Sequence, residues 1–327
     1  SSYLYRAFYA LPHLKNKDGD HTGAIYGVSN MIFKLLRSYD PVYLCVVFDA
    51  KGKNFRHEIY DQYKANRSSM PVELSEQVPP IIELIKSMGI KILQVPHVEA
   101  DDVIATLATK KYDNDINILI SSGDKDLAQL VNDKVTLINS MDEKILDPKG
   151  VVKKFGIPPE KIFDYLVLVG DKSDNIPGVD KVGPKTAISL IEKYNNLESI
   201  IDNIDNIKGK VSANLSKSID SIDIAKKLIK LKSDVEIDTK LKNYIISTKD
   251  EETLSNLATK YQLKSLSDSF KIKKVTQNIN SKKSYNIINN EPDLKDLLSR
   301  LIKNKIFAFD TETTSLDPIS ADLVGFS

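Results

Sequence analysis

The sequence predicts an α/β fold in which a mostly parallel sheet is flanked by helices. Between residues 1 and 140, short apolar runs rich in β-branched residues alternate with longer segments of helical periodicity. This alternation is typical of strand–helix–strand units. The runs show little polar alternation, as expected of parallel strands buried on both faces. Four such strands are predicted: Tyr43–Phe48, Ile90–Val95, Ile116–Ile120 and Val135–Ile138.

Helices are predicted between these strands and beyond them. The apolar residues of the intervening segments recur at helical spacing over Ala24–Leu36, Glu73–Met88 and Ala100–Lys111. After about residue 150 the strand signal fades. Pro158-Pro159 opens another helix that Gly170 ends, and residues 175–265 are helical and rich in lysine.

The last part of the chain has a different character. Residues 271–290 are polar and aperiodic, which indicates a linker. A short amphipathic helix is predicted over residues 293–303 and a strand over Ile306–Asp310. The predicted organisation is therefore an α/β core (1–174), a helical subdomain (175–268), a linker (269–290) and the start of a further domain (291–327).

Composition sets limits on the class of protein. With 327 residues, 41% of them hydrophobic and 28% charged, the chain is an ordinary globular protein long enough for two domains. Its net charge of +1 gives no sign of a nucleic-acid partner, so such a partner must be inferred from local patches of basic residues. The single cysteine, Cys45, lies in a predicted strand and fits a reducing cytosol. No apolar run approaches the length of a membrane span. We expect a cytoplasmic protein without a membrane partner.

Acidic residues gather in four clusters that follow predicted strand or helix ends. They are Asp49; Glu99, Asp101 and Asp102; Asp124 and Asp126; and Asp171 and Asp174. Each cluster alone fits a turn, a cap or a helix dipole. However, three of them follow successive strands at one edge of the predicted sheet, where open α/β sheets place their sites. Carboxylates that repel one another need positive charge, which points to a pair of divalent metal ions and phosphodiester chemistry.

In this order the motifs resemble the 5′-nuclease domain of bacterial DNA polymerase I, a relative of the flap endonucleases, over nearly all of residues 1–270. The motifs are Ser1–Ala7, Val47–Gly52, Val98–Val103, Ser122–Asp126 and Gly170–Gly178. The resemblance implies a PIN-like core followed by a helix–hairpin–helix subdomain. It also implies two Mg²⁺ ions, with Mn²⁺ as an alternative, that assist hydrolysis of a phosphodiester.

The same resemblance divides the acidic residues into two ligand groups. The inner group would be Asp49, Glu99, Asp101 and Asp102, and the outer group Asp124, Asp126, Asp171 and Asp174. In the family, an apolar strand ending in Asp-Gly immediately precedes the motif that begins here at Ser1. We therefore expect this chain to be a weak nuclease and a version extended through that strand to be active. Equal cleavage by both would contradict this expectation.

Basic residues between positions 51 and 67 form a candidate DNA-contacting segment. A solvated charged face is the alternative interpretation of such a run. The resemblance implies a mobile arch in which Lys64 and Arg67 neutralise the scissile phosphate and Tyr63 stacks on an unpaired base. Arg6 matches a phosphate-contacting residue of the first helix.

A second candidate DNA contact is the segment Ile176–Ala187, which resembles a helix–hairpin–helix. Gly178 and Gly183 would let the backbone approach a phosphate, Lys185 would add charge, and K⁺ would bind hairpin carbonyls. Lys181 stands where many relatives have glycine. A plain Gly/Pro connection between helices is the alternative. Because these contacts address the backbone, we expect a monomer that recognises a 5′ flap, nick or gapped duplex by shape and not by sequence.

Near the end of the chain, Phe307–Thr313 resembles the first motif of a 3′–5′ exonuclease domain. Asp310 and Glu312 would be metal ligands there, in a domain too incomplete for activity. The expected function is thus a structure-specific 5′ nuclease, associated with the bacterial nucleoid and used in primer removal and DNA repair. The alternatives are a flap- or nick-binding module without catalysis and, less favoured because of the hairpin, a ribonuclease on a related fold.

Overall fold

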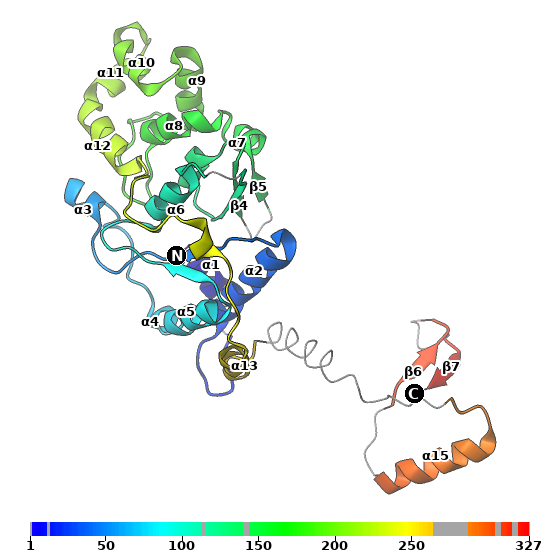
Figure 1. Cartoon of the computed structure of the whole chain (residues 1–327). Coiled ribbons are helices and arrows are strands. Elements are labelled where there is room, and N and C mark those ends of the chain that lie inside the picture. Colours follow the sequence, from blue (N-terminus) through cyan, green and yellow to red (C-terminus); the bar gives the residue numbers. More distant parts are fainter. Residues whose placement is uncertain are drawn as a thin grey trace. The chain divides into compact units, whose positions relative to one another are not determined.

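The structure is a computed structural model that describes residues 2–11, 14–112, 115–139, 144–263, 287–304, 309–315 and 320–326. It divides into two compact units, residues 1–272 and 273–327 (Figure 1). Each unit is described by itself. No helix in the described ranges is both long enough and apolar enough to cross a membrane.

The strands of the first unit confirm the α/β prediction. β1 (Cys45–Val47) pairs in parallel with β2 (Lys91–Leu93), and β3 (Ile118–Ser121) pairs in parallel with β4 (Val135–Asn139). Each strand lies within a predicted run or overlaps one. A fifth strand, β5 (Lys144–Leu146), runs antiparallel to β4. Over the described residues the strands form two separate sheets, β1–β2 and β3–β4–β5, where one sheet was expected.

One hydrophobic core is built around α1 (Ser2–Ala10), α2 (Gly23–Tyr39) and α5 (Val78–Ser87). Helix α2 buries Ile25, Val28 and Ile32 at helical spacing. Two further helices, α4 (Val72–Ser75) and α13 (Glu251–Lys260), contribute Leu74, Leu254 and Leu257 to the same core. The C-terminal part of the unit thus returns to pack against its beginning.

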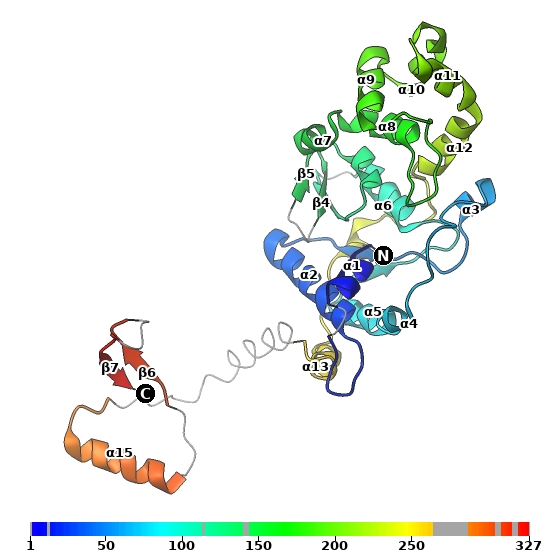
Figure 2. The same cartoon turned by 180° about the vertical axis from the view of Figure 1, so that it is seen from behind.

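A second core lies under β3, β4 and the helices that follow them. These elements are η1 (Asp126–Leu130), α7 (Pro148–Phe155), η2 (Pro159–Lys161), α8 (Ile162–Val169), α9 (Pro184–Tyr194), α10 (Leu197–Asp202), η3 (Ile204–Asn206), α11 (Lys210–Lys217), α12 (Ile219–Ile229) and η4 (Leu241–Tyr244). Helix α6 (Ala100–Thr109) lies between this helical group and the α1–α2–α5 group (Figures 1 and 2). The acidic motif at the N-terminus of α6 therefore lies where the two halves of the unit meet.

The second unit contains α15 (Glu291–Asn304) and an antiparallel pair, β6 (Thr311–Thr313) and β7 (Leu323–Phe326). The helix predicted over residues 293–303 is confirmed. The predicted strand at 306–310 and linker at 269–290 fall largely outside the described residues.

Candidate active site

The N-terminus of α6 brings the first two acidic clusters together. Glu99 is the N-cap residue, and the backbone N–H of Ala100 donates to Asp49 Oδ1 at 2.9 Å, which ties the end of β1 to the helix. Burial raises the pKa of Asp101 well above its usual range, and the negative charges of Asp124, Glu99 and Asp49 raise it further. Carboxylates from three separate chain segments therefore share one electrostatic environment.

Asp126 lies among the carboxylates of the predicted outer group, which are Asp124, Asp171 and Asp174. Burial raises the pKa of Asp126 to about 7, and Asp124, Asp171 and Asp174 also contribute. Its Oδ1 atom is buried and has no hydrogen-bond partner within the described residues. A buried, unpaired carboxylate oxygen is costly unless a cation binds it. The outer cluster therefore offers a cation an unpaired carboxylate oxygen in a region with an excess of negative charge.

This donor set fits a hard divalent cation. It consists of carboxylate oxygens, which Mg²⁺ prefers, and Mg²⁺ keeps several of its waters when it binds to protein. In the part of the chain that the structure describes, no three acidic, histidine or cysteine side chains converge closely enough to enclose an ion by themselves. An ion that is coordinated partly through its own water molecules would fit carboxylates at this spacing.

Asp102 is held differently from the other carboxylates, and its role as a metal ligand stays a prediction. Its side chain is 0% exposed. Arg56 donates to both oxygens, at 2.7 and 2.8 Å. The backbone N–H groups of Glu99 and Lys232 donate to the remaining positions at 3.0 and 2.9 Å. Four protein donors thus hold this carboxylate from inside the protein, and we leave Asp102 out of the ligand set proposed below.

Lys64 and Arg67 lie directly on the carboxylates. Lys64 Nζ lies 2.5 Å from Glu99 Oε1 and 3.5 Å from Asp174 Oδ2. The Arg67 guanidinium pairs with Asp174 Oδ1. The segment that carries them is held by the backbone N–H of Lys64, which donates to the Asp174 carbonyl at 2.9 Å. Both predicted catalytic cations are therefore brought to the acidic site.

Lys125 is a further cation of the site, which the sequence reasoning missed. Its Nζ lies 2.8 Å from Asp171 Oδ2. Burial favours a higher pKa for Asp171, but hydrogen bonds from Lys125 and Ser173 outweigh it and lower the pKa. Of the outer carboxylates, Asp171 is therefore compensated within the protein, whereas Asp126 is not.

Tyr63 is not placed to stack on a base, which corrects the prediction for it. The side chain is 3% exposed and belongs to the second hydrophobic core. Its hydroxyl donates to Glu99 Oε2 at 3.0 Å. The His57 ring packs against it edge to face, with the ring centroids 5.4 Å apart. Tyr63 therefore orients Glu99 from within the protein.

A Tyr63→Phe variant should lose stability without losing the aromatic ring. Removal of a hydrogen bond to a charged group is expected to lower the free energy of unfolding by about 1.5–3 kcal/mol. Urea denaturation measures this, with Tyr9→Phe as the control because Tyr9 is 62% exposed. Equal unfolding free energies for Tyr63→Phe and the unaltered protein would contradict the assignment.

Arg6 lies beside the third acidic cluster. A Cβ added to Gly123 would meet the Arg6 guanidinium at 2.8 Å, so the absence of a side chain at Gly123 lets the guanidinium lie against the loop that carries Asp124. Arg6 is otherwise exposed, on α1. A phosphate contact at this rim stays a prediction.

The two glycines of the predicted hairpin, Gly178 and Gly183, lie in different surroundings. A Cβ on Gly178 would lie 2.3 Å from the Val169 carbonyl oxygen, so this glycine packs against the end of α8. A contact of its backbone with DNA stays a prediction. Gly183 has open space around it and is the N-cap residue of α9. Lys185 follows it in the exposed first turn. Lys181 adopts φ +58°, the left-handed region that favours glycine.

The structure also reveals a buried arginine that the sequence reasoning did not select. Arg56, on α3 (Phe55–Ile59), is 2% exposed and pairs with Asp102. A signal was present, since the chain has only five arginines among its 46 basic residues. A chain that uses lysine so heavily keeps arginine where a planar, forked donor is needed.

In the second unit, Asp310 and Glu312 are both exposed at the start of β6. The Asp310 carboxylate accepts from the backbone N–H of Thr311 at 2.9 Å. Their role as metal ligands stays a prediction.

Comparison with known proteins defines the class. Residues 1–156 match the family described as the N-terminal resolvase-like domain of 5′–3′ exonuclease, and residues 157–252 match its C-terminal SAM fold. The two-part fold with a carboxylate-rich junction is thus that of a nuclease. The chain belongs to the 5′–3′ exonuclease family.

Relatives of two lengths are similar to the chain. A 5′–3′ exonuclease from Aquifex aeolicus is 42% identical over 264 residues, which cover 81% of this chain and 90% of that protein. DNA polymerase I from Pseudomonas aeruginosa is 40% identical over 344 residues, which span the whole chain but only 38% of the polymerase.

Solved structures share the fold at low sequence identity. T5 5′-exonuclease with bound zinc aligns with a TM-score of 0.59 at 22% identity, covering 84% of this chain and 95% of that one. The catalytic core of Rad2 in complex with DNA substrate aligns with a TM-score of 0.51 at 16% identity, covering 82% and 90%. At these identities the similarity concerns the fold alone.

Proposed function

We propose that this chain is a Mg²⁺-dependent, structure-specific 5′ nuclease that cuts DNA at flaps and nicks. The observation that carries the proposal is a group of buried carboxylates around Asp124, in which Asp126 Oδ1 has no hydrogen-bond partner among the described residues. Burial raises the pKa of Asp101 and of Asp126, and the charge of Asp124 raises both further. Such a cluster is stable as a set of anions only with bound cations. The names of the relatives, 5′–3′ exonuclease and DNA polymerase I, agree with it.

The proposed ligands are Asp49, Glu99 and Asp101 for an inner ion, and Asp124, Asp126, Asp171 and Asp174 for an outer one. The ions, Mg²⁺ or alternatively Mn²⁺, would lower the pKa of a water nucleophile and stabilise the leaving oxygen. Arg56, Asn54 and Tyr63 hold the Glu99 carboxylate in place. The protein thus orients its ligands before substrate arrives.

Lys64 and Arg67 are proposed to move from the carboxylates to the scissile phosphate. In the structure they neutralise Glu99 and Asp174. Cations bound to those carboxylates would release them, and an incoming phosphodiester is the next available anion. Arg67 is 52% exposed and can reach it without unfolding of its surroundings.

DNA is proposed to bind through its backbone. Gly183 and the free N–H groups at the start of the 11-residue helix α9 would hold one phosphate, with Lys185 and K⁺ adding charge. Arg6 would hold another near the carboxylates. No base edge is read by such contacts, so recognition would follow DNA shape and be independent of sequence. We further propose that a monomer acts, in the cytoplasm, as the N-terminal part of a DNA polymerase I in primer removal and repair.

A flap-cleavage assay tests this function. The full-length protein is expected to cut a labelled 5′ flap in Mg²⁺ and to stop on addition of EDTA, because the ions generate the nucleophile. The matched control substrate carries the same strand as a 3′ flap. Cleavage that survives EDTA would contradict the metal site.

The ion pairs that Lys64 and Arg67 make with the carboxylates favour one alternative, a module that binds flaps without cutting them. Tight flap binding with no cleavage at any Mg²⁺ or Mn²⁺ concentration would support this alternative and contradict the nuclease.

A further inference from the structure

Arg56 joins three parts of the chain inside the protein. Its Nη1 and Nη2 atoms donate to the two oxygens of Asp102 at 2.7 and 2.8 Å. Its Nε donates to the Leu228 carbonyl at 2.7 Å, and Nη2 also donates to the Lys230 carbonyl at 3.1 Å. With Glu99 Oε2 3.5 Å from Nη1, all five guanidinium N–H groups face an acceptor.

Two of these acceptors terminate helix α12. The last carbonyls of a helix lack partners within it and carry partial negative charge. The guanidinium satisfies the carbonyls of Leu228 and Lys230 at the point where the chain leaves the helical group. Beyond the end of α12, the backbone N–H of Lys232 donates to Asp102 Oδ1 at 2.9 Å. The exit from α12 is thus fixed to α6 by a fully paired polar network, which permits one geometry.

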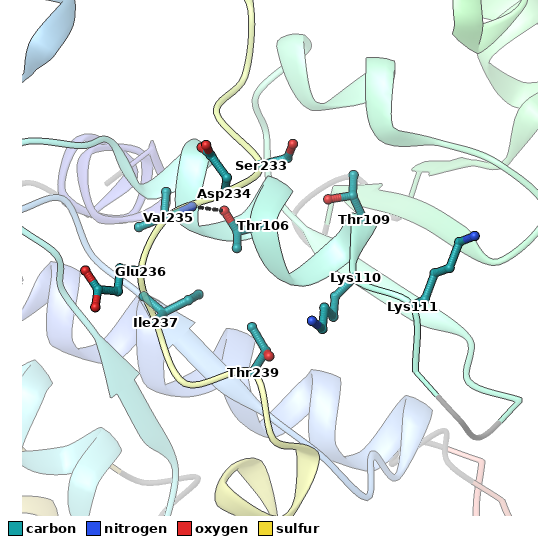
Figure 3. Close-up of a pocket in the computed structure, with 10 residues that line it drawn as sticks. All are labelled: Thr106, Thr109, Lys110, Lys111, Ser233, Asp234, Val235, Glu236, Ile237 and Thr239. Atoms are coloured by element: carbon teal, nitrogen blue, oxygen red, sulfur yellow. Dashed lines mark hydrogen bonds between the residues drawn. The ribbon is translucent and has the colours of Figure 1, made fainter.

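Beyond this network the exiting segment keeps further hydrogen bonds to Thr106 of α6, from Thr106 Oγ1 to the Lys232 carbonyl at 3.4 Å and from Val235 N to Thr106 Oγ1. Figure 3 shows residues 233–237 and Thr239 facing Thr106, Thr109 and Lys110 across a cavity of about 630 Å³, with Val235 N bonded to Thr106 Oγ1 at 3.1 Å. Arg56 and Asp102 hold the part of this segment that lies next to the acidic site, and Thr106 holds the part that follows.

The network also reaches the acidic site itself. Asp102 accepts from the backbone N–H of Glu99 at 3.0 Å, and Arg56 lies within ion-pair distance of the Glu99 carboxylate. Asn54, which caps α3, donates to Glu99 Oε1 at 2.8 Å. One cluster of buried side chains therefore fixes both a carboxylate ligand and the end of the helical group that carries the hairpin.

We propose that Arg56 and Asp102 are positioning residues that set the distance between the carboxylate site and the hairpin, and so determine which phosphodiester is cut. The inference rests on the proposed nuclease function. DNA held at the hairpin presents successive phosphates to the carboxylates, about 3.4 Å apart along the helix axis for each strand. A shift of that size between the two parts moves the cut by one nucleotide, and a smaller one slows cleavage because near-attack geometry is lost.

The test uses Arg56→Lys in the full-length protein. Lysine keeps the charge for Asp102 but lacks the fork that reaches the carbonyls. We expect kcat on a labelled 5′ flap to fall about tenfold to a hundredfold, with KM little changed and products spread over neighbouring nucleotides. Arg37→Lys, at an exposed arginine of α2, is the matched control and should cut like the unaltered protein.

Stability and positioning are separated by a second variant. Arg56→Gln combined with Asp102→Asn removes both charges and keeps a polar hydrogen-bonding group at each position, with a shorter side chain at position 56. This variant should show the same spread of products if Arg56→Lys folds poorly. An unchanged cleavage position in the folded fraction of both variants, with rates that fall only in proportion to that fraction, would overturn the inference. Failure of the unaltered protein to cut any flap would instead overturn the proposed function.

Discussion

Replacement of Asp101 by asparagine is expected to reduce flap cleavage by about a hundredfold or more, because losing a residue that only supports a ligand costs a metal site about 10- to 100-fold and losing the ligand itself costs more. The same change should raise the thermal stability of the ion-free protein, since it removes a charge that Asp124, Glu99 and Asp49 repel. Product formation in excess Mg²⁺ and the melting temperature in EDTA measure the two effects.

A variant that lowers the cleavage rate but raises the melting temperature identifies a carboxylate that serves function, because loss of a structural carboxylate would lower the melting temperature. Asp164→Asn is the matched control, because Asp164 is also a buried carboxylate of raised pKa but lies on α8 beside Glu198, outside the acidic site. It should leave cleavage unchanged. If Asp101→Asn cuts flaps at the unaltered rate, the metal-site assignment fails; if it lowers the melting temperature in EDTA, the repulsion argument fails.

Gly178→Ala is expected to lower the free energy of unfolding by about 1–3 kcal/mol, the usual range for overpacking. The added Cβ would meet backbone atoms, Val169 O at 2.3 Å and Gly170 N at 2.7 Å, which cannot rotate away as a side chain could. If these backbone atoms moved to make room, the loop that carries Asp171 and Asp174 would shift as well. Thermal unfolding measures the loss, expected as a drop of several degrees for a unit of this size.

Gly183→Ala provides the matched comparison within the same hairpin. A Cβ at Gly183 has nothing within 4 Å, so the melting temperature should stay as it is. If this backbone approaches a phosphate as proposed, the added methyl group should weaken flap binding in Ca²⁺ several-fold and equally for all sequences. An equal loss of stability in both variants would show that the two glycines do not differ in role.

Most of the fold could be predicted from local pattern. The four parallel strands were found as β-branched apolar runs, and α2, α5 and α6 overlap predicted helices, whereas the five-residue helix α3 was not predicted. Strand β5 was missed because it does not lie in an apolar run: Lys144 and Ile145 are exposed, and the strand is held by pairing with β4. The division into two sheets was also missed, because strand pairing is a long-range property that periodicity does not report.

The acidic residues of the candidate site were identified from the sequence, but the direction in which each side chain points was not. Asp101 and Asp102 are neighbours in the first turn of one helix, and nothing in their local sequence separates them. Successive helical residues point about 100° apart, so Asp101 faces the other carboxylates while Asp102 faces Arg56. Tyr63 was mistaken for an exposed stacking residue for the same reason, because its burial depends on segments far away in the chain.

The sequence by itself determined the α/β class, the order of the elements, the family and the set of acidic residues, because these follow from periodicity and from motifs read in order. Only the tertiary structure decided which of those carboxylates face one another and which are paired with protein donors. Burial, charge repulsion and hydrogen-bond satisfaction depend on segments that meet across separations as large as the 172 residues between Arg56 and Leu228. No local pattern encodes which donor arrives from that far along the chain.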